Sequence, residues 1–420
     1  MIELAEAITL VESHARALPP RRMRLADAVG RVLALPVVSD VDSPPWDRAM
    51  MDGFAVRGED VAAAGDAGVE LDVVVDVAAG HVTGIEVLPG SCARIMTGAP
   101  VPKGADAVIP IECLLPTDSA GQKAAGGHAG SRVRLRDTKF REGQHVGRRG
   151  AAFRAGQEVL APGMRLAAAE IGLAAEGGAT HVVASPQVRV AILSTGSELV
   201  SPEAVPAFGQ TRNSNGPMLF AAVKLLGGEP IPMGIAADRP EAIRAAVAQG
   251  LAADILVLSG GVSAGDLDLV PGIFARSGIE KIFHKVRLKP GKPVWFGRLE
   301  RAESSPTLVF GLPGNPASSL VCFELFVRPA MRILAGAGRD AWHLPRVKAV
   351  LTGSTKAAAD RPVYLPCRLT RSSRGLEAAP LPWTGSSDLL GLAGAGGLLA
   401  LPAGGKRYEP GEEVEVVLRD

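Results

Sequence analysis

The spacing of hydrophobic and polar residues changes three times along the chain. Over residues 2–18 apolar positions recur at helical spacing and stop at Pro19-Pro20, which predicts an amphipathic helix. Between about residues 45 and 135 apolar and polar residues alternate, as in half-buried strands, so this block is predicted to be all-β and barrel-like. From residue 186 short buried strands alternate with helices, and from about residue 340 short strands return.

These periods place individual elements along the chain. Glycine, proline and clusters of small polar residues separate the periodic segments and set their limits. Helices are expected over 2–18, 24–34, 166–176, 215–227 and 240–252, and strands over 70–80, 84–89, 93–96, 106–113, 180–184, 188–193, 229–236, 254–258, 346–351, 362–370, 397–401 and 413–418.

The same pattern predicts a multidomain fold built of α/β and β modules. Its centre is a three-layer α/β domain at 183–338 with a parallel or mixed sheet, because strands and helices alternate there. A β-rich, barrel-like domain is expected at 45–139 and a compact β module at 339–420. Residues 1–44 and 140–182 flank the β-rich domain and are predicted to form one discontinuous N-terminal domain.

Composition argues against several classes of function. Basic residues (45) and acidic residues (44) nearly cancel, so neither nucleic acid nor a membrane is expected as a partner. No apolar run approaches the roughly 20 residues of a bilayer span, and the N-terminus does not resemble a signal peptide. The four cysteines lie far apart without C-x-x-C spacing, which favours a reducing, cytoplasmic location.

The motifs of several common sites are missing. No G-x-G-x-x-G opens a predicted helix, and no G-x-x-x-x-G-K-[ST] occurs, so dinucleotide and P-loop sites are not expected. The seven histidines are scattered without metal-ligand spacing, which argues against zinc. Because basic and acidic residues nearly cancel over the whole chain, any anion site must be a local one.

Two lysines are held close together by the stiff turn Lys289-Pro290-Gly291-Lys292-Pro293. Proline fixes φ, Gly291 permits the positive φ of a tight turn, and apolar runs on both sides predict that the turn lies at the rim of a sheet. Like charges held this close favour a bound anion, unless this is an ordinary surface turn with solvated lysines. The turn GLPGNP at 311–316 leads into a helix start, whose free N–H groups also attract anions. Together the two turns favour an oxyanion site.

Carboxylates follow several predicted strands of the α/β domain. Glu198, Asp238, Asp266 and Asp268 lie just after strands, where ligands bind in open α/β sheets. Such residues often cap helices, but beside lysines and phosphates they suit hydrated Mg²⁺. In the β-rich block, Asp52 is either a turn former or a ligand to a cation or a hydroxyl group. The residues alone therefore indicate a phosphorylated or oxyanionic ligand with Mg²⁺, and no particular reaction.

Six motifs in a fixed order carry a resemblance to a known family. They are PPWDRAMMDGFAV, ARIMTGAPVPKGAD, LSTGSEL, LSGGVSAGDLDLV, KPGKPVWFG and GLPGNPASS, and they span most of the chain. In this order they closely resemble the molybdopterin molybdenumtransferases, the MoeA-type enzymes of molybdenum cofactor synthesis, a family that includes the gephyrin E domain. The resemblance implies a four-domain subunit that forms a homodimer.

The resemblance also implies an activity and its partners. A family member inserts molybdate into adenylylated molybdopterin, releases AMP and is assisted by Mg²⁺. Asp52 and Thr97 match positions that reach the cleft of the partner subunit, so each active site would be shared in the dimer. Contact with the upstream adenylyltransferase would be expected as well.

Site residues carry over by matching the family's motifs. Lys289 and Lys292 would hold molybdate, and Asp238 and Asp268 are the candidates for Mg²⁺. A dianion among lysine, arginine and hydroxyl donors is what charge-assisted hydrogen bonding selects. The pterin–nucleotide and molybdate pockets would further include Ser194, Thr195, Gly196, Glu198, Ser259, Gly260, Gly261, Ser263, Pro313, Pro316, Ser318, Arg368 and Ser386.

The chain departs from the family pattern at three positions. Asn213 stands where the family usually has an aspartate, Asp388 follows the serines where eukaryotic relatives often carry arginine, and Arg48 replaces a frequent asparagine. Three alternatives remain: a molybdopterin adenylyltransferase, a non-catalytic molybdopterin-binding scaffold, and a generic phosphate-ligand protein. The first needs only the central domain, and the third predicts binding without dependence on molybdate.

Overall fold

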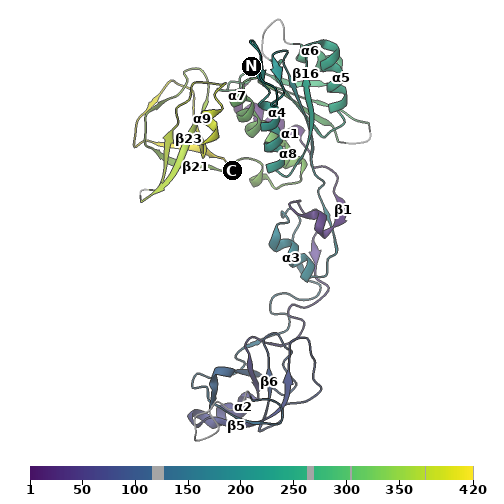
Figure 1. Ribbon diagram of the computed structural model, residues 1–420, viewed down its shortest axis with the longest axis vertical. Coiled ribbons are helices and arrows are strands. Elements are labelled where there is room, and N and C mark those ends of the chain that lie inside the picture. The colour runs from purple at the N-terminus through teal and green to yellow at the C-terminus, as the bar shows by residue number, and fades with distance from the viewer. Residues whose placement is uncertain (116–126, 263–268, 303–304, 374, 420) are drawn as a thin grey trace. The chain divides into compact units, whose positions relative to one another are not determined.

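The computed structural model describes residues 1–115, 127–262, 269–302, 305–373 and 375–419 (Figure 1). The chain divides into two compact units. The larger unit comprises Met1–Leu35, Pro162–Ala167 and Val182–Asp420, and the smaller one comprises Pro36–Ala161 and Ala168–His181. Each unit is described by itself.

A six-stranded mixed sheet forms the centre of the larger unit, in the order β16-β13-β17-β20-β19-β18. The first four strands in this order are parallel, whereas β19 runs antiparallel to both β20 and β18. The sequence predicted either a parallel or a mixed sheet, and the structure shows that the sheet is mixed. The strands are β13 (Arg189–Thr195), β16 (Glu229–Ala236), β17 (Ile255–Ser259), β18 (Glu280–His284), β19 (Trp295–Leu299) and β20 (Thr307–Leu312).

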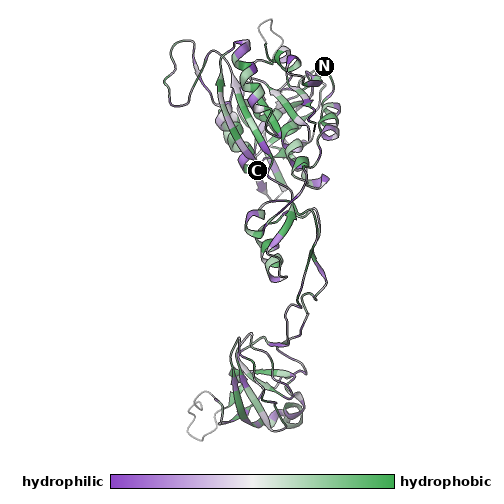
Figure 2. Cartoon of the chain, turned by 90° about the vertical axis from the view of Figure 1, so that its right-hand side faces the viewer, coloured by the Kyte–Doolittle hydropathy of each residue, from purple (hydrophilic) through white to green (hydrophobic). Residues whose placement is uncertain are grey.

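Helices cover both faces of this sheet, which confirms the predicted three-layer α/β domain. Successive side chains of a buried strand point to opposite faces of the sheet. In β17, Val257 belongs to the hydrophobic core on one face, and Leu256 and Leu258 belong to the core on the other face. Figure 2 shows green, hydrophobic stretches interspersed with purple, hydrophilic ones along the strands and helices. One face packs against α1 (Leu4–His14), α4 (Asn215–Leu225), α7 (Pro316–Cys322) and α8 (Arg328–Leu334), and the other against α5 (Pro240–Gly250) and α6 (Val270–Arg276).

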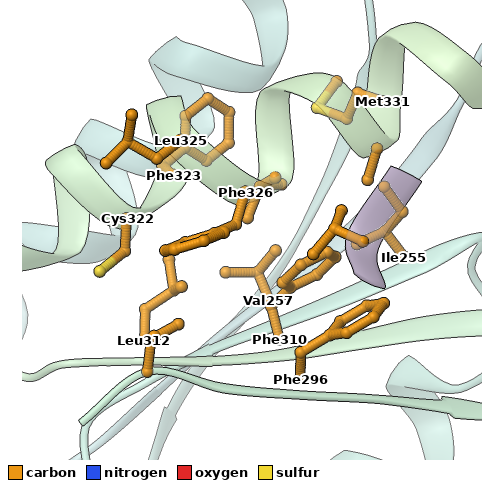
Figure 3. Close-up of a cluster of buried hydrophobic side chains, with 14 of the residues drawn as sticks. Ile255, Val257, Phe296, Phe310, Leu312, Cys322, Phe323, Leu325, Phe326 and Met331 are labelled. Carbon is orange, nitrogen blue, oxygen red and sulfur yellow. The ribbon is translucent and has the colours of Figure 1, made fainter. Parts of the chain in front are cut away.

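The core on the first face is built around aromatic side chains (Figure 3). Phe296 and Phe310 are fully buried and stack with ring centroids 4.8 Å apart. Between α7 and α8 a π-helical segment, Phe323–Val327, turns Phe323 and Phe326 into the same core. At that point Arg328 Nε donates to Glu324 Oε2, so the two buried charges neutralise each other.

A closed five-stranded barrel, β21-β24-β23-β25-β27, forms the C-terminal module. The four strands predicted here are confirmed, and the pattern missed the fifth, β24. That strand follows β23 as a tight hairpin and is paired from Cys367↔Pro380 to Ser372↔Gly375. The strands are β21 (Arg346–Leu351), β23 (Val363–Ser372), β24 (Gly375–Pro380), β25 (Gly397–Leu401) and β27 (Glu413–Leu418), with β22 (Thr355–Lys356) and β26 (Arg407–Tyr408) paired beside them.

The smaller unit is organised by a second six-stranded sheet, in the order β7-β4-β6-β5-β9-β8. This half-barrel agrees with the predicted β-rich, barrel-like domain. The strand expected at 84–89 is wrong: of its apolar residues Val87 is buried, but Leu88 is 59% exposed, so no strand face forms. The elements are β4 (Gly53–Val56), α2 (Gly58–Ala64), β5 (Val69–Val77), β6 (Ser91–Ile95), β7 (Ala107–Pro110), β8 (Leu114–Leu115) and β9 (Arg132–Leu135).

Short paired segments link the early part of the chain to residues 146–184. The helix predicted at 24–34 is wrong, because Leu25–Ala28 is one 3₁₀ turn and Gly30 then takes φ +76°, which ends helical geometry. None of the helices in the described part of the chain combines the length and the apolar character of a membrane span. The segments are β1 (Arg21–Arg24) with β12 (His181–Ala184), β2 (Val37–Val38) with β11 (Glu158–Leu160), β3 (Arg48–Ala49) with β10 (Val146–Gly147), and α3 (Ala168–Glu176).

Candidate functional site

A cleft of about 850 Å³ opens at the carboxyl ends of the parallel strands in the larger unit. The loops that follow β13, β16, β17 and β20 line it, together with the start of α4 and a loop of the C-terminal barrel. This is the edge where parallel α/β sheets bind ligands. Nine of the predicted site residues line the cleft: Thr195, Gly196, Glu198, Asp238, Ser259, Gly260, Gly261, Pro313 and Pro316.

Glycine is required at the turn after β17. Gly260 has φ +99°, and a Cβ atom on it would lie 2.4 Å from the backbone oxygen of Thr195. Gly261 has φ +62°, with Val270 Cγ2 only 2.7 Å from the place of a Cβ atom. The turn therefore keeps its backbone pressed against the neighbouring strand end and leaves the cleft open above it.

A buried polar network lies beneath the cleft. Ser194 Oγ donates to Asn213 Oδ1 at 3.1 Å, and the backbone N–H of Gly216 donates to the same oxygen at 3.0 Å. Ser259 Oγ lies 3.4 Å from Ser194 Oγ, and both serines are buried. The predicted residue Ser194 thus holds the amide of Asn213, the predicted residue Ser259 lies against Ser194, and Asn213 is an uncharged part of the cleft.

Asp238 is anchored at the rim by two reciprocal hydrogen bonds. The backbone N–H of Ser197 donates to Asp238 Oδ2 at 3.0 Å, and Ser197 Oγ accepts the N–H of Asp238 at 3.3 Å. These bonds engage Oδ2 and leave the carboxylate at an exposed rim, near the cleft-lining Glu198. Three further residues singled out in the sequence, Ser263, Asp266 and Asp268, lie outside the described residues.

The donor set suits Mg²⁺ only as an ion shared with the ligand. Within the described ranges no group of three or more His, Cys, Asp or Glu side chains converges as an all-protein metal site. Magnesium is commonly held by one or two carboxylates together with phosphate oxygens and water, and an anchored, exposed carboxylate such as Asp238 meets that need. The residues present therefore fit a metal that arrives with a phosphorylated ligand.

The lysine turn lies between β18 and β19, at the rim of the sheet as predicted. Its backbone is fastened to the barrel: Lys289 N–H donates to Pro362 O at 2.9 Å, and Lys289 O accepts Tyr364 N–H at 2.8 Å. At its other end Lys292 O accepts the N–H of Val286 at 2.9 Å. Both lysine side chains are exposed, so the turn holds two ammonium groups on a rigid backbone.

Lys289 lines a second cleft, of about 370 Å³, together with Trp383 and Thr384. The loop that begins at Trp383 continues to Ser387 and Leu389 in the first cleft, so one loop serves both clefts. Lys292 lines neither cleft, although the next residue, Pro293, lines the first.

The barrel is joined to the start of α7 at this point. Asn315 Nδ2 donates to Ser386 Oγ at 2.8 Å, and Ala317 N–H donates to Ser386 O at 3.1 Å. Of the remaining predicted residues, Ser318 is buried in α7 and Arg368 is exposed on β23, and neither lines a described cleft. The first cleft is therefore assembled from the sheet, α4 and one barrel loop.

The smaller unit brings Asp52 and Thr97 into direct contact. Thr97 donates to Asp52 Oδ1 twice, from its backbone N–H at 2.7 Å and from its hydroxyl group at 2.6 Å. These hydrogen bonds, the side-chain one first, lower the pKa of Asp52 from its ordinary value. Two residues 45 positions apart in sequence therefore form one anionic pair.

Asn215 and Asn315 are among the cleft residues that sequence reasoning missed. Asn215 begins α4, and its Nδ2 donates to Gly314 O at 2.7 Å, which joins the helix to the turn after β20. Asn315 stands in the GLPGNP motif, so its place in a proline-bounded turn before a helix was an available signal. Asn215 follows a polar stretch and carries no comparable signal.

Fold and cleft together define a class: a multidomain α/β protein with a polar cleft for a phosphorylated or oxyanionic small molecule at the carboxyl ends of its parallel strands. Family models agree with this class and cover most of the chain. Residues 2–178 match the MoeA N-terminal region (domain I and II), residues 191–333 the probable molybdopterin binding domain, and residues 348–418 the MoeA C-terminal region (domain IV).

Individual relatives extend the likeness to the full chain. A molybdopterin molybdenumtransferase of Nostoc sp. is 35% identical over 393 residues, which are 93% of this chain and 86% of the relative. Molybdopterin molybdenumtransferase 2 of Mycobacterium tuberculosis is 34% identical over 99% of both chains. The crystal structure of the molybdopterin biosynthesis MoeA protein from Pyrococcus horikoshii superposes with a TM-score of 0.79 at 28% identity, covering all of both chains. The chain belongs to the molybdopterin molybdenumtransferase (MoeA) family.

Proposed function

We propose that this protein inserts molybdate into adenylylated molybdopterin, releases AMP and so forms the molybdenum cofactor. Membership of the family supports this activity. The observation in the molecule that carries the proposal is the first cleft, which combines glycine turns, an anchored carboxylate and a proline-bounded turn at one sheet edge. These are the parts that a phosphorylated ligand with a metal ion requires.

The ligand's phosphates belong at the rim of the first cleft, beside Asp238, in this proposal. Gly260 and Gly261 leave the backbone accessible in the cleft, because any side chain there would meet Thr195 or Val270. Asp238 and, by the family motif, Asp268 would hold Mg²⁺ beside the phosphates, where the ion supplies neutralisation of charge on the phosphoanhydride. Glu198 stands on the same rim.

Molybdate belongs at the lysine turn. Lys289 and Lys292 present positive charge on a fixed backbone, and Ser386, held by Asn315, connects that region to the first cleft. Arg368 and Ser318 are assigned to the same pocket by their motifs. We expect these residues to bind and orient the two substrates, so that proximity and electrostatics supply most of the rate.

The active form is proposed to be a homodimer with shared sites. Asp52 and Thr97 form a rigid anionic pair, and the family motif assigns them to the cleft of the partner subunit. A reducing, cytoplasmic location is supported by the four cysteines, all of which are free thiols. Delivery of the adenylylated pterin by direct contact with the upstream adenylyltransferase belongs to the same proposal.

An in vitro transfer reaction tests the function. Purified protein is mixed with adenylylated molybdopterin, Mg²⁺ and micromolar molybdate, and AMP release is followed together with reconstitution of an apo-molybdoenzyme. AMP release and reconstitution that both depend on molybdate are expected. Tight binding of the pterin without AMP release would instead indicate a carrier or scaffold, and absence of binding would reject the proposal.

A further inference from the structure

Two buried polar atoms in the first cleft have no hydrogen-bond partner among the described residues. They are the hydroxyl oxygen of Thr195 and Oδ1 of Asn215. Thr195 is 4% exposed and Asn215 is 8% exposed, and both residues line the cleft. A buried polar atom left unpaired is costly, and most such atoms in folded proteins find a partner. Two such atoms in one cleft indicate that a ligand supplies the partner.

The orientation of the Asn215 amide is fixed by its surroundings. Its other atom, Nδ2, lies 2.7 Å from the backbone oxygen of Gly314, and only the NH₂ group can donate to a carbonyl. The oxygen is therefore the atom left without a partner. Because an amide oxygen accepts hydrogen bonds and never donates them, it requires an N–H or O–H group and disfavours a phosphate or molybdate oxygen.

Thr195 and Asn215 belong to one corner of the cleft. Thr195 Oγ1 lies 2.9 Å from the place of a Cβ atom on Gly260, and the corresponding point on Gly314 lies 3.6 Å from Gly260 Cα. The two glycine turns thus touch, with the Thr195 hydroxyl on one side and the Asn215 amide on the other. No charged side chain takes part in these contacts, so this corner differs chemically from the lysine turn.

We propose that Thr195 and Asn215 form a recognition pair that accepts a ring-borne N–H or O–H group of the ligand and thereby sets its direction in the cleft. The inference rests on the proposed function, since the ligand is taken to be the adenylylated pterin. The donor group belongs either to the nucleotide half, on the ribose or the purine, or to the pterin half, on its aminopyrimidine ring. Oxyanion groups lie away from this corner.

Binding measurements without molybdate test the pair. The probes are AMP, 2′-deoxy-AMP, 3′-deoxy-AMP and purine riboside monophosphate for the nucleotide half, and 6-hydroxymethylpterin with its counterpart lacking the 2-amino group for the pterin half. Titration calorimetry on the full chain compares wild type with Thr195→Val, which removes the hydroxyl group at nearly constant shape. Thr370→Val, at an exposed threonine on β23 that lines neither cleft, is the matched control.

One comparison between an intact probe and its counterpart lacking a single N–H or O–H group is expected to identify the group that donates to Thr195 and Asn215. On the wild type, loss of that donor should weaken binding about tenfold, the usual size of one buried hydrogen bond. Thr195→Val should bind the intact probe with an affinity lower by a similar factor. Removing the donor from the probe should then lower the affinity of this variant little further. Thr370→Val should behave as the wild type. We call the donor and Thr195 coupled when removing the donor weakens binding to the wild type but not to Thr195→Val. Coupling in the AMP series places the nucleotide in this corner, and coupling in the pterin series places the pterin there.

Thermal melting of the free protein provides an independent test. Thr195→Val removes a hydroxyl group that has no partner, so its melting temperature should equal or exceed that of the wild type. A clear fall would show that the fold already satisfies this hydroxyl group, which would overturn the proposal. The proposal would also be overturned if every modified probe lost the same affinity on the wild type and on Thr195→Val. In that case no ligand group pairs with Thr195, and an ordered water molecule would be the partner of both atoms.

A second variant covers the other half of the pair. Asn215→Ala should also weaken the donor-bearing probe about tenfold, while binding of the donor-less counterpart changes less. These outcomes are independent of the transfer reaction. If transfer fails but the coupling is seen, the recognition pair stands and the catalytic assignment falls; if transfer occurs without coupling, the reverse holds.

Discussion

Gly260 is a position in the first cleft where adding a single methyl group should have a large effect. It joins β17 to the cleft with φ +99°, and its N–H donates to Leu312 O at 3.0 Å. In Gly260→Ala the new Cβ atom would lie 2.4 Å from the backbone oxygen of Thr195. Since the obstructing atom belongs to the backbone, a side-chain rotation cannot relieve the contact, and the ends of β13 and β17 must separate.

Two terms set the size of the effect. A residue with a Cβ atom in the left-handed region loses about 1–2 kcal/mol, and displacing a packed strand end adds a comparable amount. The total is about 3 kcal/mol of unfolding free energy, or roughly a hundredfold change in the equilibrium constant. Gly314→Ala is the control: its φ is not in the left-handed region and its Cβ atom would make an ordinary 3.6 Å contact, so stability should change by less than about 1 kcal/mol.

Hydrogen–deuterium exchange is the suitable assay, because a chain with several domains does not unfold in one step. Peptides from β13 and β17 report the opening free energy of the α/β sheet separately from the rest of the chain. A fall of about 3 kcal/mol there is expected for Gly260→Ala, together with loss of AMP binding. Unchanged exchange in these strands would refute the steric argument, as would an equal fall in Gly314→Ala.

The remaining predictions address charge, packing and reactivity. Lys289→Ala should abolish molybdate-dependent AMP release yet leave the circular dichroism spectrum unchanged, since the side chain is exposed; full activity would remove Lys289 from the site. Thr97→Val should raise the pKa of Asp52 in a carboxyl NMR titration. Because hydrogen bonding depresses that pKa in the folded state, the stabilisation exists above the ordinary pKa and disappears as pH falls through the folded value, and an unmoved titration would contradict this. Phe310→Ala should destabilise the α/β domain by about 3–5 kcal/mol in urea unfolding, and a loss below about 1 kcal/mol would show that the core refills. Burial raises the pKa of the Cys322 thiol, so iodoacetamide at pH 8 should leave it unmodified until the protein unfolds.

Periodicity predicted elements well where one residue face is buried. In the α/β domain the strands expected at 188–193, 229–236 and 254–258 and the helices expected at 215–227 and 240–252 appear within about two residues of those limits, because a buried strand reads as a continuous apolar run. The pattern did not predict α6, α8 and β20. The predicted helix at 24–34 is wrong, because Val32 and Leu33 form isolated β-bridges to Arg165 and Ala184 instead. The pattern also missed β24, which carries few strong strand formers and is held by its hairpin partner β23.

The lysine turn shows how far local chemistry reaches. Its stiffness, its place between two strands and the helix start downstream all follow from proline, glycine and the flanking apolar runs. The tertiary contacts of the turn could not be predicted from these local features. The backbone hydrogen bonds from Lys289 to Pro362 and Tyr364 join segments that are distant in sequence, and no local signal specifies such a pairing.

By itself the sequence determined the motifs, the order of the modules and the chemistry available to the site, because these depend on residue type and short spacing. Tertiary structure alone decided which of these residues meet. It placed Thr97 on Asp52, Asn315 on Ser386 and Asn215 on the Gly314 turn. It also left the Thr195 hydroxyl buried without a partner among the described residues, since burial and hydrogen bonding depend on every segment that packs around an atom.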